Sequence, residues 1–433
     1  MEKITFLKKL PEEVIIPLVQ HKGPTCKCLV SKGDKVLAGQ LIGEPTVSSA
    51  APVHASVSGT VSSIEKYPHP FGTKTSAVII TTDETQQSVM FKPPSSPSKT
   101  QIRQIIKESG IVEIYGRPTY NVIEKIDTII LNATYESSLI AGRVGICTYP
   151  NEVSKGLKYL MEAAGAKKAY IAVNKNNKEE LNLLSGLKLD SNMEIVQLNI
   201  EYTPGMENLL VYDVTGFSAQ FGGKPEDVGV GVCGVNTAYE VYDAVKYGRP
   251  SMRVPISVVG AIGGPQSILV PIGMKFKDVI EACGGYKGEA GKLIMNGMTI
   301  GLAQYTDDVP VVKQTAGILV QTKSDVLRVD PVECTLCARC VDVCPVELLP
   351  TRLAIMADQG KFEECRMMHV MNCVECGKCA VVCPSKIPLL QLIRYAKLAI
   401  EKAYADIEEK ESPNVVVGEP PVIKFGGESE GGV

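Results

Sequence analysis

The stretch CTLCARCVDVCP (Cys334–Pro345) is repeated in pattern by CVECGKCAVVCP (Cys373–Pro384). Both stretches have the spacing C-x2-C-x2-C-x3-C-P, which is typical of chains that hold two [4Fe–4S] clusters. In that arrangement the first three cysteines of a run bind one cluster, and the fourth cysteine reaches the other cluster. The spacing therefore predicts that one cluster is held by Cys334, Cys337, Cys340 and Cys383, and the second by Cys373, Cys376, Cys379 and Cys344.

A pair of zinc sites is the structural alternative for these cysteines, because C-x2-C pairs also suit tetrahedral zinc. Zinc needs only four thiolates per ion, however, and it gives no role to a crossed fourth cysteine followed by proline. We therefore favour iron–sulfur clusters.

The overall composition indicates a folded chain of several domains. It has 433 residues, of which 45% are hydrophobic and 21% are charged, and this split excludes wholesale disorder. The 45 Lys and Arg residues nearly balance the 48 Asp and Glu residues, so the net charge of -3 gives no sign of a nucleic-acid partner.

Two features of the sequence bear on location. The first 14 residues mix lysines with glutamates and lack the apolar core of a signal peptide, so we expect a cytoplasmic protein. The longest uncharged stretch, residues 254–274, is interrupted by three prolines and four glycines, so we expect strands and turns there and no transmembrane segment.

The pattern of apolar residues and turns changes several times along the chain. Short β-like runs come first, and a polar, proline-rich linker separates them from a region where helical patterns alternate with apolar runs, as in a parallel α/β layer. A second β-rich region with a single helix follows, then the cysteine motifs, an amphipathic helix and a tail without periodicity. The expected limits are 1–84 for the β-domain, 85–100 for the linker, 101–252 for the α/β domain, 253–325 for the second β-rich domain, 326–411 for the cluster domain and 412–433 for a flexible tail.

Four segments of the chain resemble the C subunit of the Rnf electron-transport complex and its soluble relatives, such as the electron-transfer protein associated with proline reductase. The segments are SAAPVHASVSGTV (residues 49–61), Gly229–Pro250, Val258–Ile280, and the double cysteine motif with the PSKIPLLQLIRYAK that follows it. The resemblance implies a multidomain α+β fold. Its domains would be a barrel-sandwich β-domain, an α/β domain like the flavin-binding subunit of respiratory complex I, a β-grasp domain of the SLBB type and a two-cluster ferredoxin-like α domain.

In this family the α/β domain binds FMN and NADH through a glycine-rich loop, approximately GxGGAGFPT. The matching stretch here is GIVEIYGRPTYNVIE (residues 110–124), in which only Gly116, Pro118 and Thr119 correspond. The consecutive glycines that let backbone amides approach a phosphate are replaced by residues 113–115, Glu-Ile-Tyr. We therefore expect the fold to be kept as a scaffold, with a phosphate cradle that is blocked.

The family's next element, N-G-x-E-C-E-P, reads NATYESS here (residues 132–138), so the first acidic position, the cysteine and the proline are all replaced. Arg117 and Arg143 offer charges that could meet an anion in a remodelled site, or that simply lie at the surface. FMN and NADH thus stay open as further cofactors, next to the two clusters.

Three functions remain. The first, which we favour, is an electron-transfer protein that relays single electrons through two [4Fe–4S] clusters to or from a partner reductase or a ferredoxin-type protein. The second is an FMN-containing NADH dehydrogenase subunit of an Rnf-type complex, held peripherally on the inner face of the membrane. The third is a structural subunit in which the clusters only stabilise the fold of the C-terminal domain.

The remaining cysteines and histidines carry no catalytic motif. Cys26 and Cys28 would point to the same face of a strand, either as a redox-active or metal-binding pair or as two small core residues, and we favour the core interpretation. The other cysteines outside the motifs are isolated in sequence, which is typical of buried thiols. We assign no catalytic residue.

Overall fold

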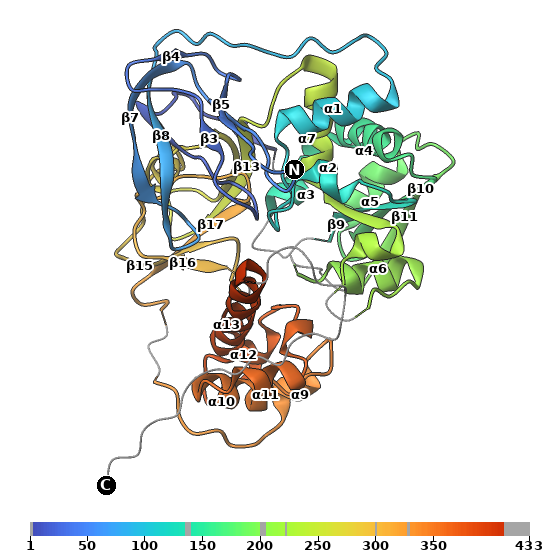
Figure 1. Cartoon of the computed structure of the whole chain (residues 1–433), viewed down its shortest axis with the longest axis vertical. Coiled ribbons are helices and arrows are strands. Elements are labelled where there is room, and N and C mark those ends of the chain that lie inside the picture. The colour runs from blue at the N-terminus through green and yellow to red at the C-terminus, as the bar shows by residue number, and fades with distance from the viewer. Residues whose placement is uncertain are drawn as a thin grey trace. The chain divides into compact units, whose positions relative to one another are not determined.

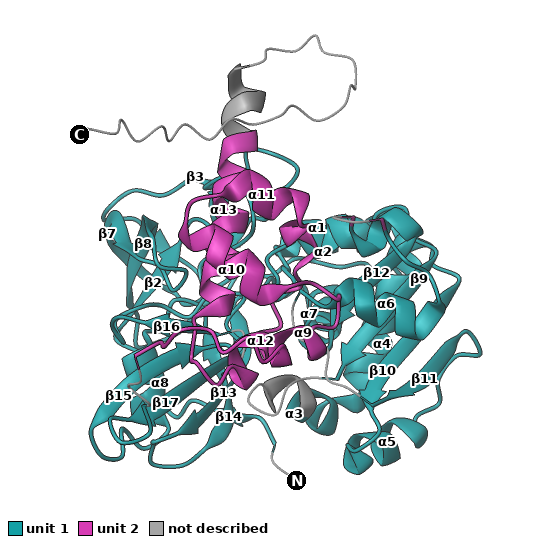
Figure 2. Cartoon of the chain, turned by 90° about the horizontal axis from the view of Figure 1, so that it is seen from below, with its two compact units in different colours: residues 1–219, 224–326 teal, residues 220–223, 327–433 magenta. Residues whose placement is uncertain are grey.

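The computed structural model of the chain describes residues 3–134, 140–199, 205–220, 223–298, 301–326 and 330–410 (Figure 1). The chain forms two compact units (Figure 2). Unit 1 consists of residues 1–219 and 224–326, and unit 2 of residues 220–223 and 327–433. The expected flexible tail, residues 412–433, lies outside the described residues.

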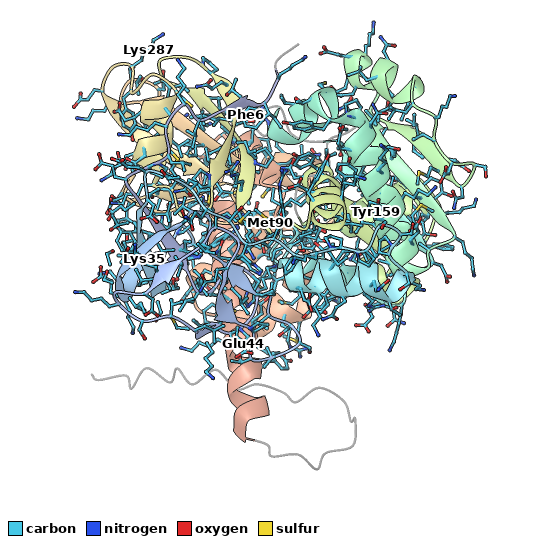
Figure 3. All side chains as sticks on the ribbon, turned by 90° about the horizontal axis from the view of Figure 1, so that it is seen from above. Phe6, Lys35, Glu44, Met90, Tyr159 and Lys287 are labelled. Carbon is cyan, nitrogen blue, oxygen red and sulfur yellow. The ribbon has the colours of Figure 1, made fainter. Side chains whose placement is uncertain are left out.

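The N-terminal part of unit 1 contains two small antiparallel sheets with the strand orders β2-β8-β7-β4 and β3-β5-β6. Alternate residues of β2 and β8, such as Val14, Ile16, Val78 and Ile80, are completely buried and form the core. The strands are β2 (Glu13–Pro17), β3 (Lys27–Cys28), β4 (Lys35–Val36), β5 (Leu41–Glu44), β6 (Val53–His54), β7 (Gly59–Pro68) and β8 (Lys74–Thr82). Charged side chains such as Lys35 and Glu44 lie at the periphery of this region (Figure 3).

The segment predicted as a linker is fixed to its neighbours by backbone hydrogen bonds. The N–H of Val89 donates to the carbonyl of Ala38, and the N–H of Phe91 donates to that of Gly248, both at 2.8 Å. The helix that follows begins with a capping box, in which the Ser98 hydroxyl accepts from the N–H of Gln101.

A four-stranded parallel sheet, ordered β11-β10-β9-β12, forms the centre of the α/β part. Its strand β9 has the consecutive buried residues Ile129, Ile130 and Leu131, as expected where helices cover both faces of a sheet. At Gly156 a side chain would collide with the backbone of Ala238, so this glycine permits the close packing of α4 on α7. The elements are α1 (Lys99–Ser109), α2 (Thr119–Val122), β9 (Thr128–Ala133), α3 (Ile140–Thr148), α4 (Pro150–Ala164), β10 (Lys168–Asn174), α5 (Lys178–Ser185), β11 (Met193–Leu198), α6 (Glu207–Thr215), the 3-10 turn η1 (Pro225–Val228), β12 (Val230–Gly234) and α7 (Val235–Tyr247).

The last part of unit 1 is a six-stranded mixed sheet in the order β1-β14-β13-β17-β15-β16, packed on helix α8. Its edge strand β1 comes from the N-terminus and pairs in parallel with β14, so the start of the chain joins this sheet. The uncharged stretch 254–274 forms most of β13 together with β14, as predicted, and no helix within the described residues is long and apolar enough to span a bilayer. The elements are β1 (Thr5–Phe6), β13 (Arg253–Gly260), β14 (Gln266–Pro271), α8 (Phe276–Ala282), β15 (Ala290–Met295), β16 (Leu302–Gln304) and β17 (Gly317–Thr322).

The three parts of unit 1 meet at the buried side chain of Lys313. Its ammonium donates to the carbonyl of Pro52 at 2.8 Å, in the β-domain, and to the carbonyl of Gly110 at 2.6 Å, in the α/β part. Burial lowers the pKa of Lys313 to about 8. One side chain thus satisfies two backbone carbonyls from distant parts of the sequence.

Unit 2 is helical. Helices α10, α11 and α13 pack around a core that includes Leu353, Ala357, Ile393 and Ile400. The amphipathic pattern after the second cysteine motif is confirmed as a helix, since Leu389, Ile393, Ala396 and Ile400 all lie on its buried face. The elements are α9 (Arg339–Asp342), α10 (Pro350–Asp358), α11 (Phe362–Met367), the 3-10 turn η2 (Val370–Asn372), α12 (Lys378–Val382) and α13 (Leu389–Lys410).

Candidate metal centre

Each cysteine motif folds as an irregular loop followed by a short helix, α9 in the first motif and α12 in the second. The two loops repeat one backbone conformation, because the same positions have a positive φ in both. The matching pairs are Leu336 with Glu375, Ala338 with Gly377, and Glu347 with Lys386. Five of these six residues are not glycine, and each such residue costs about 1–2 kcal/mol in the left-handed conformation. A backbone that alternates between right-handed and left-handed conformations turns successive N–H groups toward one side, where they can face an anion.

Backbone amides donate to the cysteine sulfurs in the same way in both loops. The N–H of Leu336 lies 3.4 Å from the Sγ of Cys334, and the N–H of Glu375 lies 3.4 Å from the Sγ of Cys373. Hydrogen bonds of this kind favour the thiolate form, which is the form that binds a metal.

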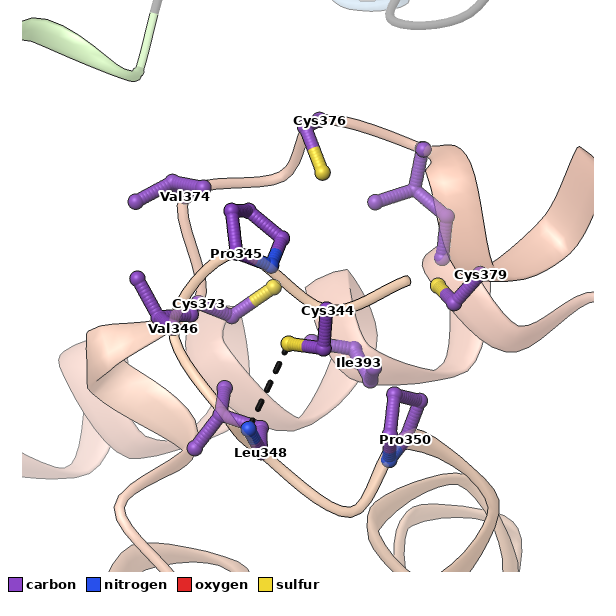
Figure 4. A pocket seen from close by; sticks show the side chains of 12 residues that line it. Cys344, Pro345, Val346, Leu348, Pro350, Cys373, Val374, Cys376, Cys379 and Ile393 are labelled. Carbon is purple, nitrogen blue, oxygen red and sulfur yellow. Dashed lines mark hydrogen bonds between the residues drawn. The ribbon is translucent and has the colours of Figure 1, made fainter. Parts of the chain in front are cut away.

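Four cysteines from both motifs line one cavity of unit 2. They are Cys344 of the first motif and Cys373, Cys376 and Cys379 of the second, and their sulfur atoms surround a common space (Figure 4). The N–H of Leu348 donates to the Sγ of Cys344 at 3.3 Å. The structure thus places the fourth cysteine of one motif beside the first three of the other.

The four thiols line a cavity with an apolar wall. Within the described residues, no three His, Cys, Asp or Glu side chains converge closely enough to hold one metal ion. Side chains such as Val346, Leu348 and Ile393 make the wall of the cavity apolar. The apolar wall would keep water away from a centre bound by these thiols.

Cys334, Cys337 and Cys340 share the first loop, and the polypeptide after Cys383 lies beside the start of that loop. The N–H of Val332 donates to the carbonyl of Ser385 at 3.1 Å. Cys340 and Cys383 also belong to one packed group of buried residues, which includes Cys379 of the other predicted set. The start of the first motif and the end of the second therefore lie side by side, as the predicted set of Cys334, Cys337, Cys340 and Cys383 requires.

Burial and crowding oppose ionisation of the Cys379 thiol. The pKa of Cys379 rises to about 12, first because the thiol is buried and then because Cys373 and Cys376 lie close to it. A bound cation compensates the charge of the thiolate, so metal binding by Cys379 would release its proton.

Helix α13 holds the second loop in place. The ammonium of Lys397 donates to the carbonyl of Cys373 at 3.0 Å and to the carboxylate of Glu375 at 2.6 Å, and Nε of Arg394 donates to the same carboxylate at 2.8 Å. The sequence did not predict these supporting residues, because the positions of the basic residues along α13 give no sign of a contact with the cysteines.

The loop that replaces the glycine-rich sequence closes on itself. The N–H groups of Glu113, Gly116 and Thr119 donate to carbonyls of Arg117, Glu113 and Ile111 in the same loop. The buried carboxylate of Glu113 accepts hydrogen bonds from the N–H of Gly234 at 3.1 Å and from the hydroxyls of Thr119 and Thr237 at 2.9 and 2.8 Å. The chain's own carboxylate therefore occupies the N-terminus of α7.

Two larger side chains of the loop also have partners within the α/β part. The hydroxyl of Tyr115 donates to the carbonyl of Val232 at 2.6 Å, and its ring lies 4.8 Å from the guanidinium carbon of Arg117. Arg117 in turn pairs with Glu226 at 2.5 Å. Gly116, Pro118 and Thr119 thus lie in a loop whose described residues do not fit a phosphate, and Arg117 is neutralised by a carboxylate.

Cys26 and Cys28 pack on the core of the β-domain. Their thiols donate to the carbonyls of Ala51 and Val30, at 3.3 and 3.4 Å. This arrangement supports their interpretation as small core residues.

Comparison with protein families places four domains along the chain. The matches are the RnfC barrel sandwich hybrid domain over residues 2–85, the Nuo51 FMN-binding domain over 106–243, the SLBB domain over 255–303 and a 4Fe-4S dicluster domain over 326–384.

Whole-length relatives agree with this order. The C subunit of the ion-translocating oxidoreductase complex of Methanosarcina acetivorans is 43% identical, over 92% of this chain and 95% of its own length. The chain belongs to the RnfC family. The C subunit of the Na(+)-translocating ferredoxin:NAD(+) oxidoreductase complex of Acetobacterium woodii is 35% identical over 90% of this chain and 92% of its own length. Its proton-translocating counterpart from Clostridium ljungdahlii is 35% identical over 90% and 88%.

The fold also resembles a solved structure. The crystal structure of an NAD+-reducing [NiFe]-hydrogenase in the H2-reduced state covers 73% of this chain and 68% of its own, with a TM-score of 0.51 and 18% identity. The RnfC-like resemblance, the multidomain α+β fold, the two [4Fe–4S] clusters and the electron-transfer function are therefore confirmed.

Proposed function

We propose that this RnfC-family chain relays single electrons through two [4Fe–4S] clusters whose ligands cross between the motifs. Cys334, Cys337, Cys340 and Cys383 would hold the first cluster, and Cys373, Cys376, Cys379 and Cys344 the second. The observation that carries this proposal is the cavity of unit 2, where Cys344 lies with the three leading cysteines of the other motif.

When bound, each cluster supplies a one-electron redox change without bond formation. The chain's own residues would do the rest. The cysteines bind, the N–H groups of Leu336 and Glu375 stabilise thiolate charge, and side chains such as Leu348 and Ile393 exclude water.

The proposed partners follow from the one-electron chemistry of the clusters. We propose a one-electron donor or acceptor protein, either a ferredoxin-type carrier or a partner reductase. The relatives are named as C subunits of ion-translocating oxidoreductase complexes, which supports a place for this chain in such a complex. We propose that it lies there peripherally, on the inner face of the membrane. We also keep, as a proposal, the domain limits given by the sequence.

A second candidate function is NADH oxidation with FMN, which the match of residues 106–243 to the Nuo51 FMN-binding domain favours. The loop around Glu113 and Tyr115 opposes it, because its amides and its buried carboxylate leave no cradle for a phosphate. We therefore do not include a flavin of this domain in the proposed electron-transfer path.

The test is the iron, sulfide and flavin content of anaerobically purified protein, followed by titration with NADH and then with dithionite at visible wavelengths. We expect about eight irons per chain, no flavin, no bleaching by NADH and full bleaching by dithionite. Stoichiometric FMN together with bleaching by NADH would overturn the proposal in favour of the second candidate.

A further inference from the structure

The two halves of the cluster domain have matching backbones, so differences between corresponding side chains stand out. Positions can be matched by counting from the fourth cysteine of each motif, Cys344 and Cys383. The seventh residue after Cys344 is Thr351, and the seventh residue after Cys383 is Leu390. Each is the second residue of its helix, α10 or α13.

Thr351 contacts a predicted ligand of the first cluster. Its hydroxyl oxygen lies 2.9 Å from the Sγ of Cys340. Because a ligating cysteine is a thiolate without a proton, the hydroxyl must be the donor when the cluster is bound. The corresponding Leu390 lines the cavity of the other four cysteines and offers no donor.

The same difference occurs a second time, directly after the first cysteine of each motif. Thr335 directly follows Cys334 and places a hydroxyl in the first loop, two residues before Cys337. The corresponding residue of the second motif is Val374, which lines the cavity around Cys376. The first cysteine set thus has two hydroxyls nearby, one of them in contact with a sulfur, at positions where the second set has two apolar side chains.

The loops also differ in exposure to solvent. Leu336 is 82% exposed and Cys337 is exposed, whereas the corresponding Glu375 and Cys376 are only partly exposed. Reduction adds negative charge to a cluster, and both hydrogen bonds to sulfur and contact with water stabilise that charge. The two differences therefore act in the same direction. The cations Lys397 and Arg394 at the second loop act in the opposite direction, but they share the carboxylate of Glu375, which offsets part of their charge.

We propose that the cluster of Cys334, Cys337, Cys340 and Cys383 has the higher reduction potential of the two, and that the hydroxyls of Thr335 and Thr351 raise it. This inference rests on the proposed ligand sets. Electron transfer within the chain then runs from the reduced second cluster, which loses one electron, to the oxidised first cluster, which gains it. No proton moves, and no bond forms or breaks. Thr335 and Thr351 act as positioning residues through the sulfurs of nearby cysteines.

The test is a redox titration of the full-length protein under argon, in which electron paramagnetic resonance measures the reduced form of each cluster. The variants are Thr351→Val and Thr335→Val, which remove the hydroxyls at nearly constant volume. For the double variant we expect the ratio of reduced to oxidised first cluster at a fixed potential to fall about tenfold, a shift of ~59 mV for one electron. The second cluster should keep its midpoint.

Three controls accompany this titration. Thr351→Ser retains a hydroxyl and should restore the midpoint, and Val374→Thr, which adds a hydroxyl beside Cys376, should raise the midpoint of the second cluster. Cys337→Ala identifies the signal of the first cluster, because it should remove that signal alone.

Unchanged midpoints at full iron content, equal shifts of both clusters, or a first cluster with the lower midpoint in the unmodified protein would each overturn the inference. In all three cases the proposed relay would still stand. Fewer than about eight irons in the unmodified protein, or loss of both signals in Cys337→Ala, would instead overturn the proposed function and this inference with it. If Thr351→Val loses iron, the midpoints of Thr335→Val and Val374→Thr still test the effect of a hydroxyl, because Thr335 and Val374 lie in loops and not in the core of a helix.

Discussion

The hydroxyl of Ser385 donates to the backbone carbonyl of Glu333 at 2.9 Å. Ser385 lies two residues after Cys383, and Glu333 directly precedes Cys334, so this bond joins the end of the second motif to the start of the first. The bond would hold Cys383 near the first loop, as the proposed ligand set requires.

Replacement of Ser385 by alanine should weaken this approach. The loss of one such hydrogen bond costs about 0.5–1.5 kcal/mol, and the backbone bond from Val332 to the same residue remains. We therefore expect faster loss of about half of the iron when Ser385→Ala is exposed to a chelator, measured by absorbance under argon. Equal acceleration for all of the iron would contradict the link to one cluster.

The paired left-handed positions give a second prediction. Ala338 has a φ of 58°, while the corresponding residue of the second loop is Gly377, with a φ of 74°. A non-glycine residue pays about 1–2 kcal/mol in this conformation. Ala338→Gly should therefore slow iron loss to a chelator by several fold, and Gly377→Ala should accelerate it. The same direction for both variants would show that the loop conformation does not control cluster retention.

The buried carboxyl of Glu113 should make the stability of the α/β part depend on pH. Burial raises its pKa from the ordinary 4.5 to about 7, although hydrogen bonds from Thr237, Gly234 and Thr119 oppose the rise. The folded state thus holds this proton more tightly than the unfolded state, so stability falls as pH rises from about 4.5 to about 7. At about 1.4 kcal/mol per pKa unit, the loss reaches about 3 kcal/mol.

Glu113→Gln removes this ionisation and tests the prediction. The amide places an N–H donor near the N–H of Gly234, so the variant should be less stable than the unmodified protein at pH 5. The gap between their melting temperatures should shrink between pH 5 and pH 8, as followed by circular dichroism under argon. Melting curves that stay parallel over this range would exclude the proposed ionisation.

Lys313 should hold three parts of unit 1 together. In Lys313→Met the carbonyls of Pro52 and Gly110 lose their donor, and a buried acceptor left unsatisfied costs about 1–3 kcal/mol. We expect a lower melting temperature and faster hydrogen exchange in the segments around both carbonyls. The exposed Lys35→Met is the matched control and should change neither quantity. Faster exchange confined to the region around Lys313 itself would contradict its role as a link.

The sequence predicted the repeated features of this molecule well and its long-range contacts poorly. The cysteine spacing and the stripe Leu389, Ile393, Ala396 and Ile400 are local patterns, so the clusters and α13 could be predicted directly. The altered glycine-rich loop also indicated a blocked cradle.

The supporting contacts were not predictable, because they join residues far apart in the sequence. Lys397 reaches Cys373 across 24 positions, Ser385 reaches Glu333 across 52, and Lys313 reaches Pro52 across 261. The carboxylate of Glu113 at the start of α7 likewise depends on how the loop folds back on the sheet. The domain limits read from the sequence remain a prediction.

The crossing of the ligands is tested most directly by electron paramagnetic resonance of the dithionite-reduced chain in three single variants, Cys344→Ala, Cys376→Ala and Cys337→Ala. Cys365→Ala, a buried cysteine of unit 2 outside both ligand sets, is the control that should retain both signals. We predict that Cys344→Ala loses the same signal as Cys376→Ala and retains the one that Cys337→Ala loses. Loss in Cys344→Ala of the signal that Cys337→Ala loses would contradict the crossed arrangement.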